Sequence, residues 1–149
     1  MHARSYVLAV GASLGLSLCL TAALAQEEPL KVRQNLMKEI GRSVGGLGAI
    51  AKGEKPYDAA TVETSLKTIN TNAKAFPDLF PAGSGTGETE ALPAVWEKPD
   101  DFRAKADKLV ATSGTLLASV PMDQAGVGEA LRVLGADCSS CHETYRAKK

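Results

Sequence analysis

The sequence Cys138-Ser139-Ser140-Cys141-His142, close to the end of the chain, constrains the fold more than any other feature. Two thiols at this spacing with an imidazole directly after them are the attachment signature of c-type haem, in which the thiols form thioethers and the imidazole binds the iron. If residues 136–146 are helical, Cys138, Cys141 and His142 lie at i, i+3 and i+4 and share one helix face. The motif therefore predicts one covalently attached haem c, held by Cys138 and Cys141 with His142 as an iron ligand.

Residues 1–25 have the pattern of a secretory signal peptide. A weakly basic start is followed by an apolar run from Tyr6 to Leu20 and by the small-residue cleavage site Ala23-Leu24-Ala25. The run is too short and too rich in Gly and Ser for a membrane span, so we expect no stable membrane insertion. The sequence thus predicts a periplasmic protein whose mature domain covers residues 26–149, and export fits haem attachment, which is completed outside the cytoplasm.

Composition limits the other functions that the mature chain could have. Lys and Arg number 17 and Asp and Glu number 17, so the chain is nearly neutral and offers no support for nucleic-acid binding. Two of the three cysteines and one of the two histidines remain after cleavage, and all of them lie in the motif. A disulfide scaffold would scatter its thiols, and a zinc site would need further ligands elsewhere.

Apolar residues recur at steps of three and four in four segments, which indicates four amphipathic helices. The expected helices cover residues 30–51, 59–76, 99–120 and 123–145, and residues 94–97 form a short helical turn. The connections are short, long and short, the long one being a Gly/Pro-rich crossover over residues 77–93. We therefore predict an all-α, antiparallel four-helix bundle, with the first helix beside the last and the haem enclosed between helices.

The residue on the other side of the iron should come from the first helix. Met37 lies on the inward stripe of that helix, whereas Met122 lies at the far end of the last helix from the motif. A methionine on an apolar stripe either fills the core or binds the iron, and both interpretations stay open for Met37.

Three further residues are candidates for contacts with the haem. Arg33 lies one turn before Met37 on the same face, where an arginine needs a partner: a haem propionate, or water at an exposed helix end. Gln34 next to it and Arg146, one turn beyond His142, are candidates too, with a solvated side chain as the alternative for each.

The mature chain resembles the class II c-type cytochromes, the cytochrome c′ family. The resemblance rests on Arg33-Gln34 with Met37, Gly41-Arg42, residues 52–58, Pro93-x-x-Trp96, Phe102, and Cys138-x-x-Cys141-His142-x-x-Tyr145-Arg146. It implies a monohaem bundle of one of two kinds. A low-spin branch uses a methionine at the Met37 position as sixth ligand and transfers electrons, whereas cytochromes c′ proper leave the iron five-coordinate and bind nitric oxide or carbon monoxide.

The expected function is one-electron transfer to and from periplasmic redox partner proteins, with no enzymatic reaction. His142 is then the proximal ligand and Met37 the distal one. The first alternative is a gas-binding protein in which Met37 screens a five-coordinate iron. A third interpretation is a haem-free helical interaction protein, or a weak zinc site, in which the Cys-x-x-Cys-His motif occurs by chance. A homodimer is common in the family and is possible here.

Overall fold

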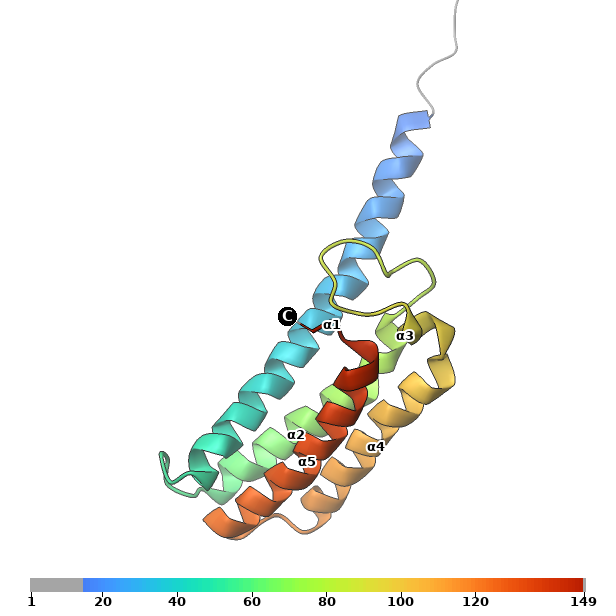
Figure 1. The fold of residues 1–149 in the computed structure, drawn as a ribbon. Helices are drawn as coiled ribbons and strands as arrows, with labels where there is room; N and C mark the ends of the chain where they lie inside the picture. Colours follow the sequence, from blue (N-terminus) through green and yellow to red (C-terminus); the bar gives the residue numbers. More distant parts are fainter. Residues whose placement is uncertain (1–14, 149) are drawn as a thin grey trace, which may run out of the picture.

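The computed structural model describes residues 15–148 and consists of helices joined in up-and-down order (Figure 1). Four long helices and two short ones follow one another: α1 (Gly15–Ala51), α2 (Ala59–Ala75), the 3-10 helix η1 (Phe76–Leu79), α3 (Ala94–Glu97), α4 (Pro99–Ala118) and α5 (Gln124–Tyr145). Within residues 15–148 the β pairing is limited to one isolated bridge between Ala91 and Arg146. The predicted all-α, four-helix architecture is confirmed.

The helix ends follow from local chemistry. The carboxylate of Asp58 accepts a hydrogen bond from the Thr61 backbone N–H at 2.7 Å and caps α2. Asp123 caps α5 in the same way through the backbone N–H of Gly126, at 2.8 Å. Pro99 occupies the first turn of α4, where a missing backbone N–H breaks no helical hydrogen bond. These helices begin where the sequence predicted.

The start of α1 differs from the prediction. The helix was expected from Leu30, but it begins at Gly15 and continues through Pro29. Residues 18–28 are rich in Leu, Ala, Gln and Glu, which favour helix strongly enough to continue the turn on the N-terminal side of the proline. This part of α1 extends beyond the bundle in Figure 1. Residues 1–14, which hold much of the predicted signal peptide, lie outside the described residues.

The four long helices form a closed ring of neighbours. α1 packs against α2 and α5, and α4 packs against the same two helices. Each neighbour runs antiparallel to the next (Figure 1). The first and last helices therefore lie side by side, as the short–long–short order of connections predicted. No helix among residues 15–148 has a stretch both long and apolar enough to cross a bilayer.

The apolar core is continuous along one part of the bundle and aromatic at the other end. The main cluster includes Leu47, Ile50, Leu66, Val127 and Leu134, each at most 2% exposed. Burial of such a side chain contributes about 1.5–3 kcal/mol to folding. This well-packed part holds the helices in register and so fixes the walls of the other end.

The aromatic end lies beneath the long crossover. Phe102 and Tyr145 are buried there, and Phe80 stacks edge-on against Phe102 with ring centroids 4.9 Å apart. The crossover is also bonded to the chain end after α5: the Leu92 N–H donates to the Tyr145 carbonyl at 3.0 Å and the Ala147 N–H to the Glu90 carbonyl at 2.8 Å. These bonds fasten the C-terminal end of α5 in place.

Candidate functional site

A cavity of about 780 Å³ opens between the helices near the crossover. Its volume lies within the range of roughly 300–1,000 Å³ that is typical of cofactor pockets. Much of the wall is apolar, and the residues that supply it come from α1, α2 and α4: Ile40, Val44, Ala73, Ala106 and Leu109. The core is thus incomplete at the place where the sequence predicted an enclosed haem.

The three motif side chains line this cavity from α5. Cys138, Cys141 and His142 are half-buried, and both cysteines are free thiols. α5 is helical from Gln124 to Tyr145, so the predicted i, i+3, i+4 arrangement on one face is confirmed. Two thiols and one imidazole therefore converge on one side of a single pocket.

Burial controls the protonation of these groups. It raises the pKa of the Cys138 thiol, with a further contribution from the charge of Asp137, and it raises the pKa of the Cys141 thiol. The pKa of His142 is lowered, first by burial and then by the nearby charge of Arg146. The site thus favours neutral thiols and a neutral imidazole, and the neutral imidazole is the form that binds a metal.

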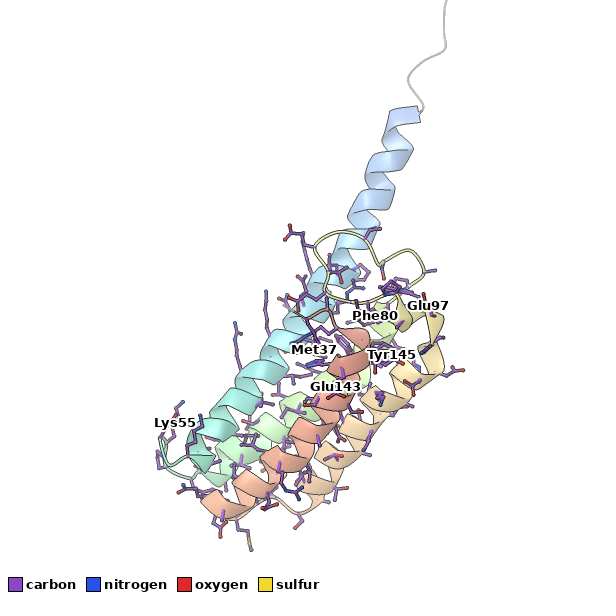
Figure 2. All side chains as sticks on the ribbon, viewed as in Figure 1. Met37, Lys55, Phe80, Glu97, Glu143 and Tyr145 are labelled. Atoms are coloured by element: carbon purple, nitrogen blue, oxygen red, sulfur yellow. The ribbon has the colours of Figure 1, made fainter. Side chains whose placement is uncertain are left out.

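Met37 lines the same cavity from a neighbouring helix. It lies on α1, is half-buried and packs against the main core cluster. Figure 2 shows Met37 beside the part of α5 that carries Tyr145, far from Lys55 at the other end of the bundle. Met122 is 86% exposed and lies just before α5, as the sequence predicted. Of these two methionines, Met37 alone shares a cavity with His142.

The residues present fit a haem. The pocket offers two thiols for thioether bonds, an imidazole nitrogen for the iron and an apolar enclosure, which together are the donor set of a c-type cytochrome. Gly41, one turn after Met37, also lines the pocket, and a Cβ added there would meet no other atom within 4 Å. This glycine leaves room for a flat group against α1.

Arg33 lines the cavity. Of the two environments expected for it, water at an exposed helix end is wrong. The residue is only 3% exposed. Its guanidinium donates to both the hydroxyl and the carbonyl of Ser84, at 3.2 and 2.8 Å, to the Thr89 hydroxyl at 3.0 Å and to the Leu79 carbonyl at 3.4 Å. It also lies 4.5 Å from the ring centroid of Phe80. The long crossover folds over this part of α1 and removes Arg33 from water, and burial lowers the pKa of Arg33.

Gln34 and Arg146 lie at the rim of the cavity. Gln34 is half-buried and donates from Nε2 to the Glu88 carbonyl at 2.8 Å, so it too is tied to the crossover. The side chain of Arg146 is 52% exposed and lies 3.9 Å from the Glu90 carboxylate. The structure therefore brings all of the predicted site residues to one cavity, and a contact of Arg33, Gln34 or Arg146 with the haem stays a prediction.

A buried carboxylate at the same cavity was missed by the sequence reasoning. Asp137 is 5% exposed and lines the pocket directly before Cys138. It lies three residues after the buried Leu134 and four before Cys141, which is the spacing of an inward-facing helix position. An acidic residue at such an inward-facing position was the sequence signal that could have revealed Asp137.

A zinc site gains no support from the side chains. Within residues 15–148, no three His, Cys, Asp or Glu residues gather as a metal cluster of these ligands would require. Cys138, Cys141 and His142 instead line an apolar pocket large enough for an organic cofactor.

Comparisons with known proteins agree with this geometry. The family model described as Cytochrome C′ matches residues 28–146. Cytochrome c-556 of Agrobacterium fabrum is 57% identical over 132 residues, which cover 89% of this chain and 89% of that protein. Cytochrome c-554 of Cereibacter sphaeroides is 41% identical over 145 residues, which cover 91% and 95%.

A solved structure has the same fold. Cytochrome c′ of Rhodopseudomonas palustris superposes with a TM-score of 0.74 at 36% sequence identity, covering 78% of this chain and 94% of that one. The pocket, the motif and these matches lead to one conclusion: the chain belongs to the cytochrome c′ family of class II c-type cytochromes, four-helix proteins that bind one haem c covalently.

Proposed function

We propose that this protein is a periplasmic electron carrier whose haem c is attached through Cys138 and Cys141, with His142 as proximal and Met37 as distal iron ligand. The observation that carries the proposal is the position of Met37, on the helix facing α5 and in the wall of the same cavity as His142. With haem bound, the thioether of Met37 and the imidazole of His142 would be the two side chains that hold the iron in a low-spin state.

Covalent attachment would be an addition without a leaving group. Each thiol sulfur would bond to one carbon of a haem vinyl group, and the thiol proton would go to the other vinyl carbon. The half-buried thiols of Cys138 and Cys141, one helical turn apart, would hold the group against α5. His142 follows directly and needs no separate segment of chain to bring it to the iron.

The haem supplies a one-electron couple between ferric and ferrous iron. One electron would enter from a reduced donor protein and leave to an oxidised acceptor protein, so no bond of a substrate would be made or broken. The chain contributes enclosure: Ile40, Ala106 and Leu109 keep water from the pocket, and burial among apolar side chains favours the less charged ferrous state.

The location of the protein follows from the leader-like residues 1–25. We propose that they are removed after export and that residues 26–149 work in the periplasm, where c-type haem is attached and redox partner proteins are met. The proposal also includes a homodimer, which is compatible with the family.

A second function has support from the family itself. The matching family model is that of cytochrome c′, and the superposed Rhodopseudomonas palustris protein is a cytochrome c′. In the corresponding arrangement Met37 would screen a five-coordinate, high-spin iron without binding it, and the open position would accept nitric oxide or carbon monoxide. Arg33, Gln34 and Arg146 would contact the haem edge in either case.

The absorption spectrum of the oxidised protein tests the choice between these functions. We expect a low-spin spectrum with a methionine-to-iron charge-transfer band that is lost in Met37→Ala. Met122→Ala is the matched control, because Met122 is exposed and distant from the pocket, and it should keep the band. A wild-type protein that is already high-spin and binds carbon monoxide readily would contradict the electron-carrier proposal.

A further inference from the structure

Asp137 is a buried acidic residue in the wall of the haem cavity. Its side chain is 4% exposed, and the residue directly precedes Cys138 on α5. The Thr112 hydroxyl on α4 donates to Oδ2 at 2.6 Å, and the Lys108 ammonium on the same helix lies 3.4 Å from Oδ1. A hydroxyl donor and an ammonium group therefore hold the carboxylate, with its negative charge, in the wall of the pocket.

The counter-charge of Lys108 does not cancel this charge in the pocket. The Lys108 side chain is 69% exposed, so water screens its ammonium strongly, whereas the carboxylate of Asp137 is shielded from water. The charge of Asp137 also reaches Cys138, where it adds to burial in raising the pKa of the thiol. The other charged side chains that line the cavity are Arg33, Lys38, Glu88, Glu90, Arg146 and Lys105, whose ammonium donates to the Ser140 hydroxyl at 2.7 Å.

We propose that Asp137, held in place by Thr112 and Lys108, lowers the reduction potential of the haem. When one electron arrives from a reduced donor protein, the net charge in the cavity falls by one unit. A carboxylate held in the wall opposes this change because it stabilises the more positive, ferric state. Asp137 therefore offsets part of the preference for ferrous iron that apolar burial creates.

The test is the midpoint potential of haem-loaded Asp137→Asn, measured by optical titration. The amide keeps the shape and can still accept the Thr112 hydrogen bond, but the charge is gone. We expect the reduction equilibrium to shift about threefold to tenfold toward the ferrous form, and tenfold corresponds to 59 mV for a one-electron couple. The absorption spectrum should stay that of the wild type, which separates a charge effect from a change of ligands.

Two further variants keep the test decisive. Glu129→Gln also removes one negative charge from α5, but Glu129 is exposed and paired with Arg132, so the potential should not change. Lys108→Gln removes the partner of Asp137 from an exposed position that tolerates substitution, and it should lower the potential slightly, less so in high salt. A potential in Asp137→Asn no higher than in Glu129→Gln, or a higher potential in Lys108→Gln, would overturn the proposal.

The inference rests on the proposed attachment of haem through Cys138 and Cys141. A pyridine haemochrome spectrum of each purified protein therefore comes first. Wild-type protein without haem c would contradict the proposed function together with this inference. A haem-loaded protein whose potential is insensitive to Asp137 would contradict this inference alone.

Discussion

Arg33 shows how one buried side chain can join the distal helix to the crossover. Its guanidinium bonds to three residues of the segment 79–89 and stacks on Phe80, so α1 and the crossover are held together one turn before Met37. The planar fork of an arginine suits several carbonyl and hydroxyl acceptors at once, which the single ammonium of a lysine cannot match.

We predict that Arg33→Gln lowers the free energy of unfolding by about 2–4 kcal/mol, because it leaves several acceptors of the crossover, among them the buried Ser84, without their donor. Arg33→Lys should recover only part of this loss. Urea unfolding at neutral pH measures both. The control is Arg132→Gln, whose exposed ion pair with Glu129 should contribute less than about 1 kcal/mol. Equal losses at positions 33 and 132 would contradict the structural role of Arg33.

Tyr145 makes the stability of the folded protein depend on pH in the alkaline range. The residue is buried, and its hydroxyl donates to the Asp101 carboxylate at 2.5 Å. Burial, followed by the bond to Asp101, raises the pKa of Tyr145 from 10.0 to about 12. The folded state therefore holds the phenol proton at pH values where the unfolded chain has released it.

The sign of the effect follows from this difference in proton binding. The stabilisation is fully present below pH 10 and is lost progressively as the pH rises from 10 toward 12. We predict that wild type loses more stability than Tyr145→Phe between pH 9.5 and pH 11.5, in denaturant unfolding at the two pH values. Parallel losses in the two proteins would show that the phenol has no such linkage.

Short sequence signals, such as capping residues, determine where the helices begin and end. α5, which carries the haem motif, begins after the Asp123 cap, whose carboxylate accepts from the Gly126 N–H, one of the first-turn groups that have no acceptor within the helix. We predict that Asp123→Ala costs about 1 kcal/mol of stability and that Asp123→Ser restores much of it, since serine also caps. The haem spectrum should not change. A serine variant as unstable as the alanine variant would argue against the cap.

At this scale the sequence predicted helices well because their signals are local. The spacing of apolar residues and the Gly/Pro-rich crossover predicted the helices from α2 to α5, and the motif placed its three residues on one face of α5. The start of α1 was predicted wrongly because Pro29 interrupts a stretch of strong helix formers without ending the helix.

The partners of buried polar groups could not be predicted, because they depend on tertiary contacts. The hydrogen bonds of Arg33 join residues about 50 positions apart, and no spacing along α1 indicates that the crossover folds over it. Asp137 meets its partners only once α4 and α5 are packed. The ligation of Met37 depends on a distance to iron that periodicity cannot supply.

The whole molecule is built around a gap in its own core. One part of the bundle is packed tightly around residues such as Leu66 and Val127, while the other part surrounds about 780 Å³ of cavity. A cavity of this size would cost much stability if it stayed empty, because its apolar walls would lose their packing partners. The haem is thus a structural part of the core as well as the redox centre.

We therefore predict that Cys138→Ser/Cys141→Ser, which cannot form thioethers, is less stable and less helical than the haem-loaded wild type. Circular dichroism should show a lower melting temperature and a loss of helix near the open end of the bundle. The control is Ser139→Ala/Ser140→Ala, which changes the two intervening residues and keeps both thiols. A serine double variant that melts together with the haem-loaded protein would contradict this view of the core.

Intact-mass spectrometry of the exported protein tests the central claim most directly. The account predicts a polypeptide heavier by the mass of one haem, with Cys138 and Cys141 inaccessible to a thiol-alkylating reagent under denaturing conditions. A mass equal to that of the polypeptide alone, with both cysteines alkylated, would contradict it.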